Sequence, residues 1–121
     1  MSDTNPAPAL PFSTSVRAGD WLIVSGQLGL RDNALVEGGV KPQTAAALEN
    51  LAAVLEANGA SLAHVKKALV FLADMEYFGE MNTVYAEAFA GAQLPARTCV
   101  AVAGLPQGGL VEVEAWAWLG E

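Results

Sequence analysis

Two segments near the C-terminal end alternate with period two, and they constrain the fold of this chain more than any other feature. They are Arg97–Ala103 and Leu110–Trp118, and the stretch between them, residues 104–109, is rich in glycine. Such alternation is typical of strands that bury one face. We therefore predict two strands that pair with each other as a terminal antiparallel hairpin.

The second predicted strand separates two kinds of side chain. Its valines and alanines, at positions 111, 113, 115 and 117, fall on one face, and Glu112 and Glu114 share the other face with Trp116 and Trp118. We place Arg97 on this polar face as well. An arginine and two glutamates interleaved with tryptophans make a poor surface for open water. The pattern indicates a covered face whose charges meet a ligand or a partner.

The rest of the chain predicts two helices and four further strands. One helix begins at Pro42 and ends before Gly59, and the other is capped by Asp74 and runs to about Phe89. The further strands are Ser13–Arg17, Trp21–Gly26, residues 34–36 and Val65–Leu72. This order indicates an α+β fold of a single domain, residues 1–121, with two helices on one face of a six-stranded mixed sheet.

The composition limits the partners of this chain. A formal net charge of -7 opposes binding to nucleic acid, which needs clustered lysine and arginine. A content of 53% hydrophobic residues favours self-association through an apolar face. No apolar run reaches the roughly 20 residues that span a membrane, and no signal peptide is visible. We therefore expect a cytoplasmic protein.

Cys99 is the only cysteine, so no intrachain disulfide can form, which agrees with a reducing compartment. The single histidine, His64, falls in the loop before Val65 and is not placed to activate a thiol. We therefore expect Cys99 to be a small packed residue rather than a nucleophile.

Several short motifs follow one another along nearly the whole chain. They are Val-Ser-Gly-Gln at 24–27, Glu-Asn-Leu at 49–51, Val-Phe-Leu-Ala-Asp-Met at 70–75, Met-Asn-Thr-Val-Tyr at 81–85, Pro-Ala-Arg-Thr-Cys-Val at 95–100, Leu-Pro at 105–106 and Val-Glu-Val-Glu-Ala at 111–115. In this order and spacing they resemble the RidA/YjgF family of imine/enamine deaminases. The resemblance implies a chorismate-mutase-like fold and a homotrimer with inward-facing sheets and ligand clefts between subunits.

The same resemblance implies a site built from Arg97, Cys99, Glu112, Ser25 and Asn82. Arg97 would bind the carboxylate of a 2-imino acid, since a guanidinium binds a planar carboxylate through two parallel hydrogen bonds. The backbone at Cys99 would add hydrogen bonds, and Glu112 would position water for attack on the C=N carbon. The products would be a 2-oxo acid and ammonia. No metal or organic cofactor is needed, because an imine is already electrophilic.

Two positions depart from the pattern of the deaminases. Leu10-Pro11-Phe12-Ser13 stands where they usually have Gly-Pro-Tyr-Ser, so the hydroxyl of a cleft-lining tyrosine is absent at Phe12. Gly29 stands where they usually have proline. Phe12 marks either slow activity or a relative that binds a different small carboxylate, and the sequence leaves both open.

Simpler interpretations of the same residues also remain open. Arg97 could form an interface salt bridge with Glu112 or Glu114 of a neighbouring subunit. Ser25 could be an ordinary turn residue, and Asn82 could be a helix-surface residue. Three functions compete: hydrolysis of 2-imino acids, non-catalytic binding of small carboxylates by a trimer, and endoribonuclease activity. The acidic charge disfavours the third, whereas the first two would both use Arg97.

Overall fold

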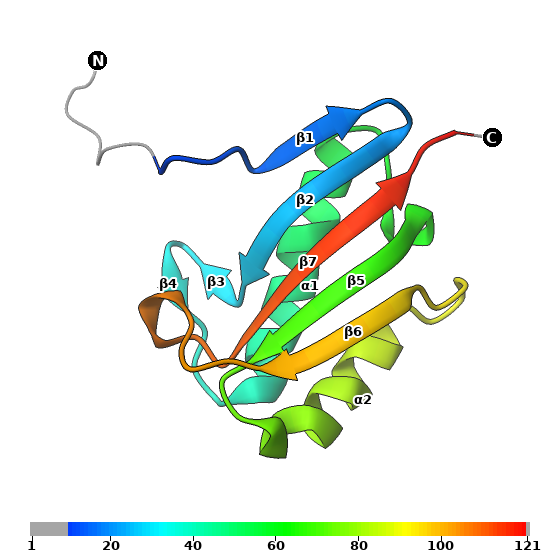
Figure 1. Cartoon of the computed structure of the whole chain (residues 1–121). Coiled ribbons are helices and arrows are strands. Elements are labelled where there is room, and N and C mark those ends of the chain that lie inside the picture. The colour runs from blue at the N-terminus through cyan, green and yellow to red at the C-terminus, as the bar shows by residue number, and fades with distance from the viewer. Residues whose placement is uncertain (1–9, 121) are drawn as a thin grey trace.

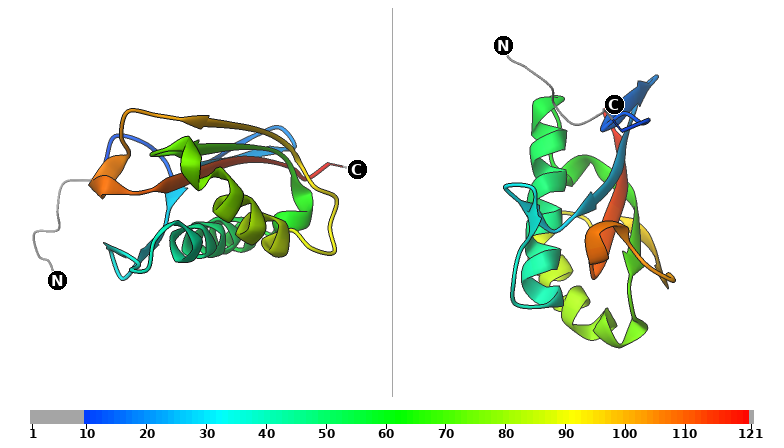
Figure 2. Two further views of the ribbon diagram at one scale, coloured as in Figure 1. Left: turned by 90° about the horizontal axis from the view of Figure 1, so that it is seen from below. Right: turned by 90° about the vertical axis from the view of Figure 1, so that its left-hand side faces the viewer.

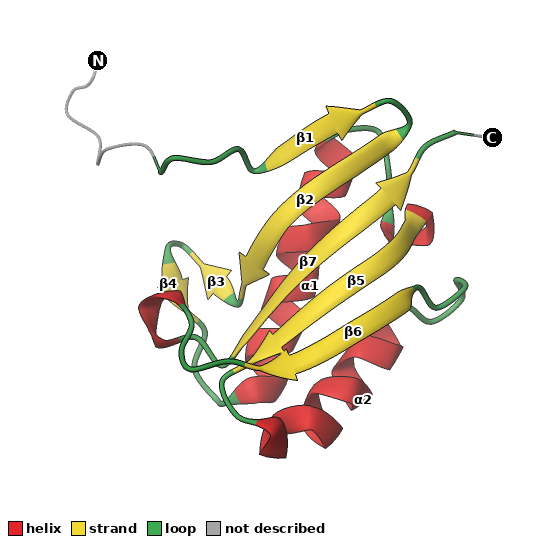
Figure 3. Ribbon diagram, viewed as in Figure 1, coloured by secondary structure: helices red, strands yellow, loops and turns green. Residues whose placement is uncertain are grey.

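The computed structural model describes residues 10–120 and shows helices α1 (Val40–Ala57) and α2 (Phe78–Ala88) on one face of a mixed sheet (Figures 1 and 2). The five strands of this sheet lie in the order β1 (Ser15–Ala18), β2 (Trp21–Leu28), β7 (Val111–Trp118), β5 (Val65–Leu72) and β6 (Ala96–Ala101). Three one-turn 3₁₀ helices lie at Leu62–His64, Met75–Tyr77 and Pro106–Gly108 (Figure 3). The predicted α+β class is confirmed. The first residues, in which we expected no signal peptide, lie outside the described part.

The predicted terminal hairpin is wrong. β5 lies between the two C-terminal strands, parallel to β6 and antiparallel to β7 (Figure 1). The connection from Val102 to Leu110 therefore has to pass the end of β5, and it is longer than the loops of about two to five residues that close most hairpins. Alternation identifies a strand, but it does not say which strand pairs with it.

The main sheet has five strands within residues 10–120, not the predicted six. The strand expected at residues 34–36 is β4 (Ala34–Leu35), which pairs only with β3 (Leu30–Arg31). The turn between them is tight, because Asp32 and Asn33 both have left-handed backbone conformations, with φ of 55° and 66°. This small hairpin is too short to extend the main sheet.

Helix α1 ends as the sequence predicts, but it begins at Val40, before the predicted start at Pro42. Pro42 lies in its first turn, where a missing N–H removes no helical hydrogen bond. After the cap residue Asn58, Gly59 adopts a left-handed conformation with φ of 77°, which ends the helix. No helix within residues 10–120 is both long enough and apolar enough to cross a bilayer.

Helix α2 is shorter than predicted. The Asp74 carboxylate accepts a hydrogen bond from the Glu76 N–H at 2.9 Å, so the predicted cap is present. It caps the 3₁₀ turn Met75–Tyr77, however, and the α-helix starts only at Phe78. This turn carries α2 to its place beneath β6 (Figure 2).

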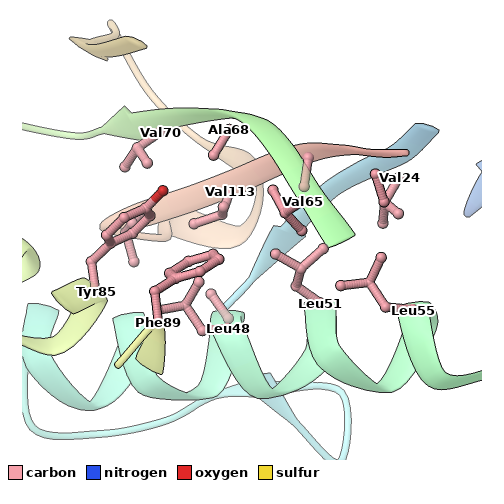
Figure 4. Packing of buried hydrophobic residues seen from close by; sticks show 14 of the residues in the cluster. Val24, Leu48, Leu51, Leu55, Val65, Ala68, Val70, Tyr85, Phe89 and Val113 are labelled. Carbon is pink, nitrogen blue, oxygen red and sulfur yellow. The ribbon is translucent and has the colours of Figure 1, made fainter. Parts of the chain in front are cut away.

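The core lies between the helices and the sheet. Leu48, Leu51 and Leu55 of α1, with Tyr85 and Phe89 from the α2 region, point toward the strands (Figure 4). The valines and alanines of β7 are fully buried against them, which confirms the predicted division of that strand. Burial of one large aliphatic side chain stabilises a fold by about 1.5–3 kcal/mol, so this layer holds β7 in place.

Side chains of α1 fix the ends of the central strands. The Asn50 amide donates hydrogen bonds to the carbonyl oxygens of Leu28 and Leu30, at 3.0 and 2.9 Å. The Gln43 side-chain oxygen accepts one from the Leu110 N–H at 2.9 Å. The end of β2 and the start of β7 are thus tied to the same helix.

Gly29 lies where a side chain would collide with the backbone of α1. A Cβ atom at this position would lie 2.5 Å from the backbone oxygen of Gln43 and 2.6 Å from its Cα. Neither proline nor alanine fits there unless α1 moves away. The departure at Gly29 therefore concerns the contact between α1 and the end of β2.

Candidate functional site

The predicted site residues divide between the two faces of the sheet. Arg97 and Cys99 pair across the sheet with Ala68 and Val70 of β5, which are fully buried under the helices. Directly paired residues point to the same face, so Arg97 and Cys99 lie on the helix side. The prediction that Arg97 shares a face with Glu112 is therefore wrong. It followed from the assumed hairpin, since side-chain faces depend on which strands pair.

Arg97 lies on the edge strand, above α2. Its guanidinium carbon is 4.8 Å from the ring centroid of Tyr85 and 5.5 Å from that of Phe78, within cation–π range. Its Nη1 lies 3.8 Å from the sulfur of Met81, its one side-chain hydrogen-bond acceptor within residues 10–120. No carboxylate of residues 10–120 forms an ion pair with it. Its planar donor fork is therefore available to an anion from outside the chain.

An open cavity of about 290 Å³ lies beside this guanidinium, and it brings Asn82 and Arg97 together as predicted site residues. Its lining residues are Asn82, Tyr85, Ala86, Leu94, Pro95 and Arg97. The Asn82 Oδ1 and the Tyr85 hydroxyl are buried without a hydrogen-bond partner in the described part of the chain. Buried polar atoms usually have partners, so both atoms are suited to a ligand or an ordered water. We call Arg97, Asn82 and Tyr85 the arginine half-site.

Tyr85 was not among the predicted site residues. It belongs to the apolar stripe of α2, a pattern that predicts packing in the core. Its ring does pack against that of Phe89, with the ring centroids 4.7 Å apart. Burial raises the pKa of Tyr85, and the charge of Arg97 only partly opposes this. The hydroxyl therefore stays protonated near neutral pH and can donate a hydrogen bond.

Cys99 packs against the edge of the core, next to Arg97 on the same face. Burial raises the pKa of its thiol, and the charge of Arg97 partly opposes this. A neutral thiol is a weak nucleophile, so the side chain suits packing better than covalent chemistry. Among the described residues, no group of histidine, cysteine and carboxylate side chains is arranged to hold a metal ion.

The remaining predicted residues, Phe12, Ser25 and Glu112, lie together on the open face of the sheet. They line a cavity of about 400 Å³ with Ile23, Val24, Gly26 and Glu114. We call Phe12, Ser25 and Glu112 the glutamate half-site. The sheet itself separates it from the arginine half-site, so the two do not meet within one chain.

Glu112 and Glu114 differ in their surroundings. The Glu114 carboxylate accepts a hydrogen bond from the indole N–H of Trp116 at 3.0 Å, whereas Glu112 accepts none within residues 10–120. Burial raises the pKa of Glu112, and the charge of Glu114 raises it further. A carboxylate with a raised pKa is a better proton acceptor than an ordinary glutamate. Glu112 is thus the better base of the two.

Ser25 lies in a bulge of β2. The register with β7 shifts between Val24 and Gln27, so Ser25 and Gly26 together lie opposite Glu114. Bulges of this kind redirect side chains and are frequent beside functional sites. Here the bulge brings the backbone of β2 against the side chain of Glu112.

Ser25 also holds the chain segment that carries Phe12. Its hydroxyl donates to the carbonyl oxygen of Ser13 at 2.6 Å, and its N–H donates to that of Thr14 at 2.9 Å. Phe12 is 61% exposed, and its ring forms one wall of the cavity. Because the Ser25 hydroxyl proton is already donated, its oxygen is left to accept a hydrogen bond from a ligand.

The open face is apolar around the glutamate half-site. Trp21 packs edge-on against Trp116 and Trp118, with ring centroids 6.1 and 5.0 Å apart. Val100, on the same face of β6, is 42% exposed. Coverage of this face by other copies of the chain stays a prediction.

The chain is similar in sequence and in structure to proteins of one family along almost its whole length. The sequence model of the family described as Endoribonuclease L-PSP matches residues 2–119. A RutC family protein from Pyrococcus horikoshii is 43% identical over 120 residues, which cover 98% of this chain and 94% of that protein. The 2-iminobutanoate/2-iminopropanoate deaminase of Mus musculus is 43% identical over 118 residues, which cover 94% of this chain and 87% of that enzyme. The crystal structure of Escherichia coli TdcF with bound serine is similar with a TM-score of 0.88 at 32% identity, covering 95% of this chain and 93% of that one.

Proposed function

The chain belongs to the RidA/YjgF family, and on that basis we propose that it hydrolyses 2-imino acids to 2-oxo acids and ammonia. The observation that carries this proposal is Arg97, a half-buried guanidinium with no anionic partner in the described residues, beside a cavity of about 290 Å³. Such a group suits the carboxylate of a small acid. The mouse relative bears the name of a deaminase of this kind, and TdcF was crystallised with serine, another small carboxylate.

The proposed site needs a second copy of the chain. The arginine half-site lies at the β6 edge on the helix side, whereas the glutamate half-site lies on the open face. In the proposed homotrimer, the open face of one subunit meets the β6 edge of the next, and a ligand lies between them. The partly exposed tryptophans and Val100 support this arrangement, because contact would remove apolar surface from water.

The proposed reaction begins with the substrate carboxylate bound to the guanidinium fork of Arg97. The backbone at Cys99 adds a hydrogen bond, and Asn82 and Ser25 line the cleft. Glu112 accepts a proton from a water molecule as the water oxygen bonds to the C=N carbon and the imine π electrons move to nitrogen. The nitrogen takes up this proton from Glu112, which gives a carbinolamine. Glu112 then accepts the proton of the new hydroxyl group and passes it to the nitrogen, the C–N bond breaks, and ammonia leaves as the C=O bond forms. One imino acid and one water thus yield one 2-oxo acid and one ammonia.

We also propose that residues 1–121 form one domain and that the protein acts in the cytoplasm, where the thiol of Cys99 stays reduced. Phe12 brings an apolar ring to the cavity, where the deaminases usually have a phenol. The proposed substrates are therefore 2-imino acids as a class.

The test is the release of a 2-oxo acid from a 2-imino acid that an amino acid oxidase generates in situ. Wild-type protein should raise the rate above the uncatalysed rate, and Glu112→Gln should not. If wild type binds 2-oxobutanoate without raising the rate, the protein is a carboxylate-binding member of the family. If it instead cleaves single-stranded RNA, the protein is an endoribonuclease, as the family description says. The net charge of -7 opposes this outcome, because it disfavours RNA binding.

A further inference from the structure

Gly26 and the side chain of Glu112 share a space that a larger residue would fill. A Cβ atom at position 26 would lie 2.7 Å from both Cδ and Oε2 of Glu112, and 2.9 Å from its Cγ. These separations are much shorter than the ordinary contact distance of about 3.5–4.0 Å between carbon atoms. The carboxyl group of Glu112 therefore rests directly on the bare backbone of Gly26.

Packing alone determines where this carboxylate points within the described residues. Glu114 is held by the indole of Trp116 at 3.0 Å, but Glu112 has neither a hydrogen bond nor an ion pair in residues 10–120. Its carboxyl group lies against the peptide surface of Gly26. Among the described residues that line the cavity, Glu114 is the one other titratable group.

Hydrogen bonds hold the backbone around Gly26 in place, whereas the carboxylate of Glu112 is held by packing alone within residues 10–120. The Gln27 amide donates to the Ser25 carbonyl at 3.0 Å, and the Asn50 amide donates to the Leu28 carbonyl at 3.0 Å. These two bonds lie on either side of Gly26 and fix the bulge to itself and to α1. An added methyl group at position 26 would therefore push the carboxylate away rather than move the strand.

We propose that Gly26 is a positioning residue for imine hydrolysis, whose missing side chain lets the Glu112 carboxylate lie on the β2 bulge and face the attacking water. The inference rests on the proposed function, since it needs Glu112 as the base. A displacement of a catalytic group by about 1 Å can lower a rate by about 10²-fold. A displaced carboxylate would also gain contact with water, which lowers its pKa.

The first experiment compares Gly26→Ala with Gly79→Ala in the imine assay. Gly79 is an exposed glycine of α2 with ordinary φ and no atom within 4 Å of an added Cβ, so it is a matched control. We expect Gly26→Ala to lower kcat by about 10- to 100-fold with little change in KM, because Arg97 is untouched. The low-pH limb of its rate profile should move to lower pH. Gly79→Ala should keep the kcat and the pH profile of wild type.

The second experiment measures the Glu112 carboxyl directly, without turnover. Carbon-13 NMR titration of the glutamate carboxyl groups should show a lower pKa for Glu112 in Gly26→Ala than in wild type and in Gly79→Ala. An unchanged pKa would show that the carboxylate has not moved and would overturn the inference.

A third measurement covers the case in which Gly26→Ala does not fold. In the Glu112→Ala background the added methyl group has no carboxyl to displace, so the double variant should fold with the melting temperature of Glu112→Ala. If the double variant also fails to fold, the backbone itself requires glycine and the inference is wrong. If Gly26→Ala hydrolyses the imine at the same rate as the wild type, the inference is wrong but the proposed function stands. Absence of hydrolysis in the wild type overturns both.

Discussion

Replacement of Arg97 by lysine is the sharpest test of the arginine half-site. Arginine offers a carboxylate two parallel N–H donors, whereas lysine offers a flexible point charge. Loss of one charge-assisted hydrogen bond removes about 1.5–3 kcal/mol. Because 1.4 kcal/mol is a factor of ten in affinity, Arg97→Lys should weaken binding of 2-oxobutanoate by roughly 10- to 100-fold.

The same substitution should change stability little. Arg97 has no ion pair within residues 10–120, and its contacts there are the rings of Tyr85 and Phe78 and the sulfur of Met81. A lysine at this position keeps a cation near both rings, and a partly exposed cation–π contact contributes only about 0.5–1 kcal/mol. The melting temperature and the oligomer mass should therefore stay close to those of wild type.

Isothermal titration calorimetry with 2-oxobutanoate measures this effect, with Arg17→Lys as a matched control. Arg17 is exposed, and its Nη2 lies 3.9 Å from Oδ1 of Asp20, outside both half-sites. The same change at Arg17 should therefore leave binding unaltered. Equal affinity of wild type and Arg97→Lys would refute the assignment of Arg97 as the carboxylate anchor. Dissociation of the oligomer in Arg97→Lys would instead identify Arg97 as an interface salt-bridge residue.

The remaining predictions concern the glutamate half-site and assembly. Glu112→Gln should keep 2-oxobutanoate affinity but lower imine hydrolysis by about 10²–10⁴-fold, because an amide cannot accept the proton; retained turnover would place the base elsewhere. Glu114→Gln removes the like charge that raises the pKa of Glu112, so the low-pH limb of the rate profile should move to lower pH, and an unmoved limb would exclude Glu112 as the titrating group. Phe12→Tyr should raise hydrolysis by a few-fold up to about tenfold, the value of one hydrogen bond of about 0.5–1.5 kcal/mol, whereas lower activity and lower stability together would indicate a cleft adapted to another ligand. Light scattering should give the mass of a trimer, and a monomer mass would remove the shared cleft.

The elements of this fold were predictable where the cause is local. The end of α1 and the capped turn before α2 follow from Gly59 and Asp74, whose conformations or side chains act within a few positions. The buried face of β7 follows from alternation along a single strand. Each of these depends on short-range geometry, which a sequence records directly.

Strand pairing is a different kind of property. Whether Arg97 and Glu112 share a face depends on β5 lying between β6 and β7, and Val65–Leu72 precedes both along the chain. Period-two alternation is the same for a parallel and an antiparallel neighbour, so the pattern could not choose between them. Tyr85 was missed for a related reason, because a helical apolar stripe does not reveal which of its members lies under an arginine of another element.

Because Arg97 and Glu112 lie on opposite faces of the sheet, the proposed site needs two chains. With Arg97 and Glu112 on one face, a single chain could have bound a carboxylate and activated water by itself. With the sheet between them, each chain presents Arg97 at its β6 edge and Glu112 on its open face. Under the proposed assembly, catalysis and association are therefore the same event, because the contact that buries the open face also completes the cleft. The apolar surface around Trp116 then serves both the stability of the oligomer and the exclusion of water from the proton transfer.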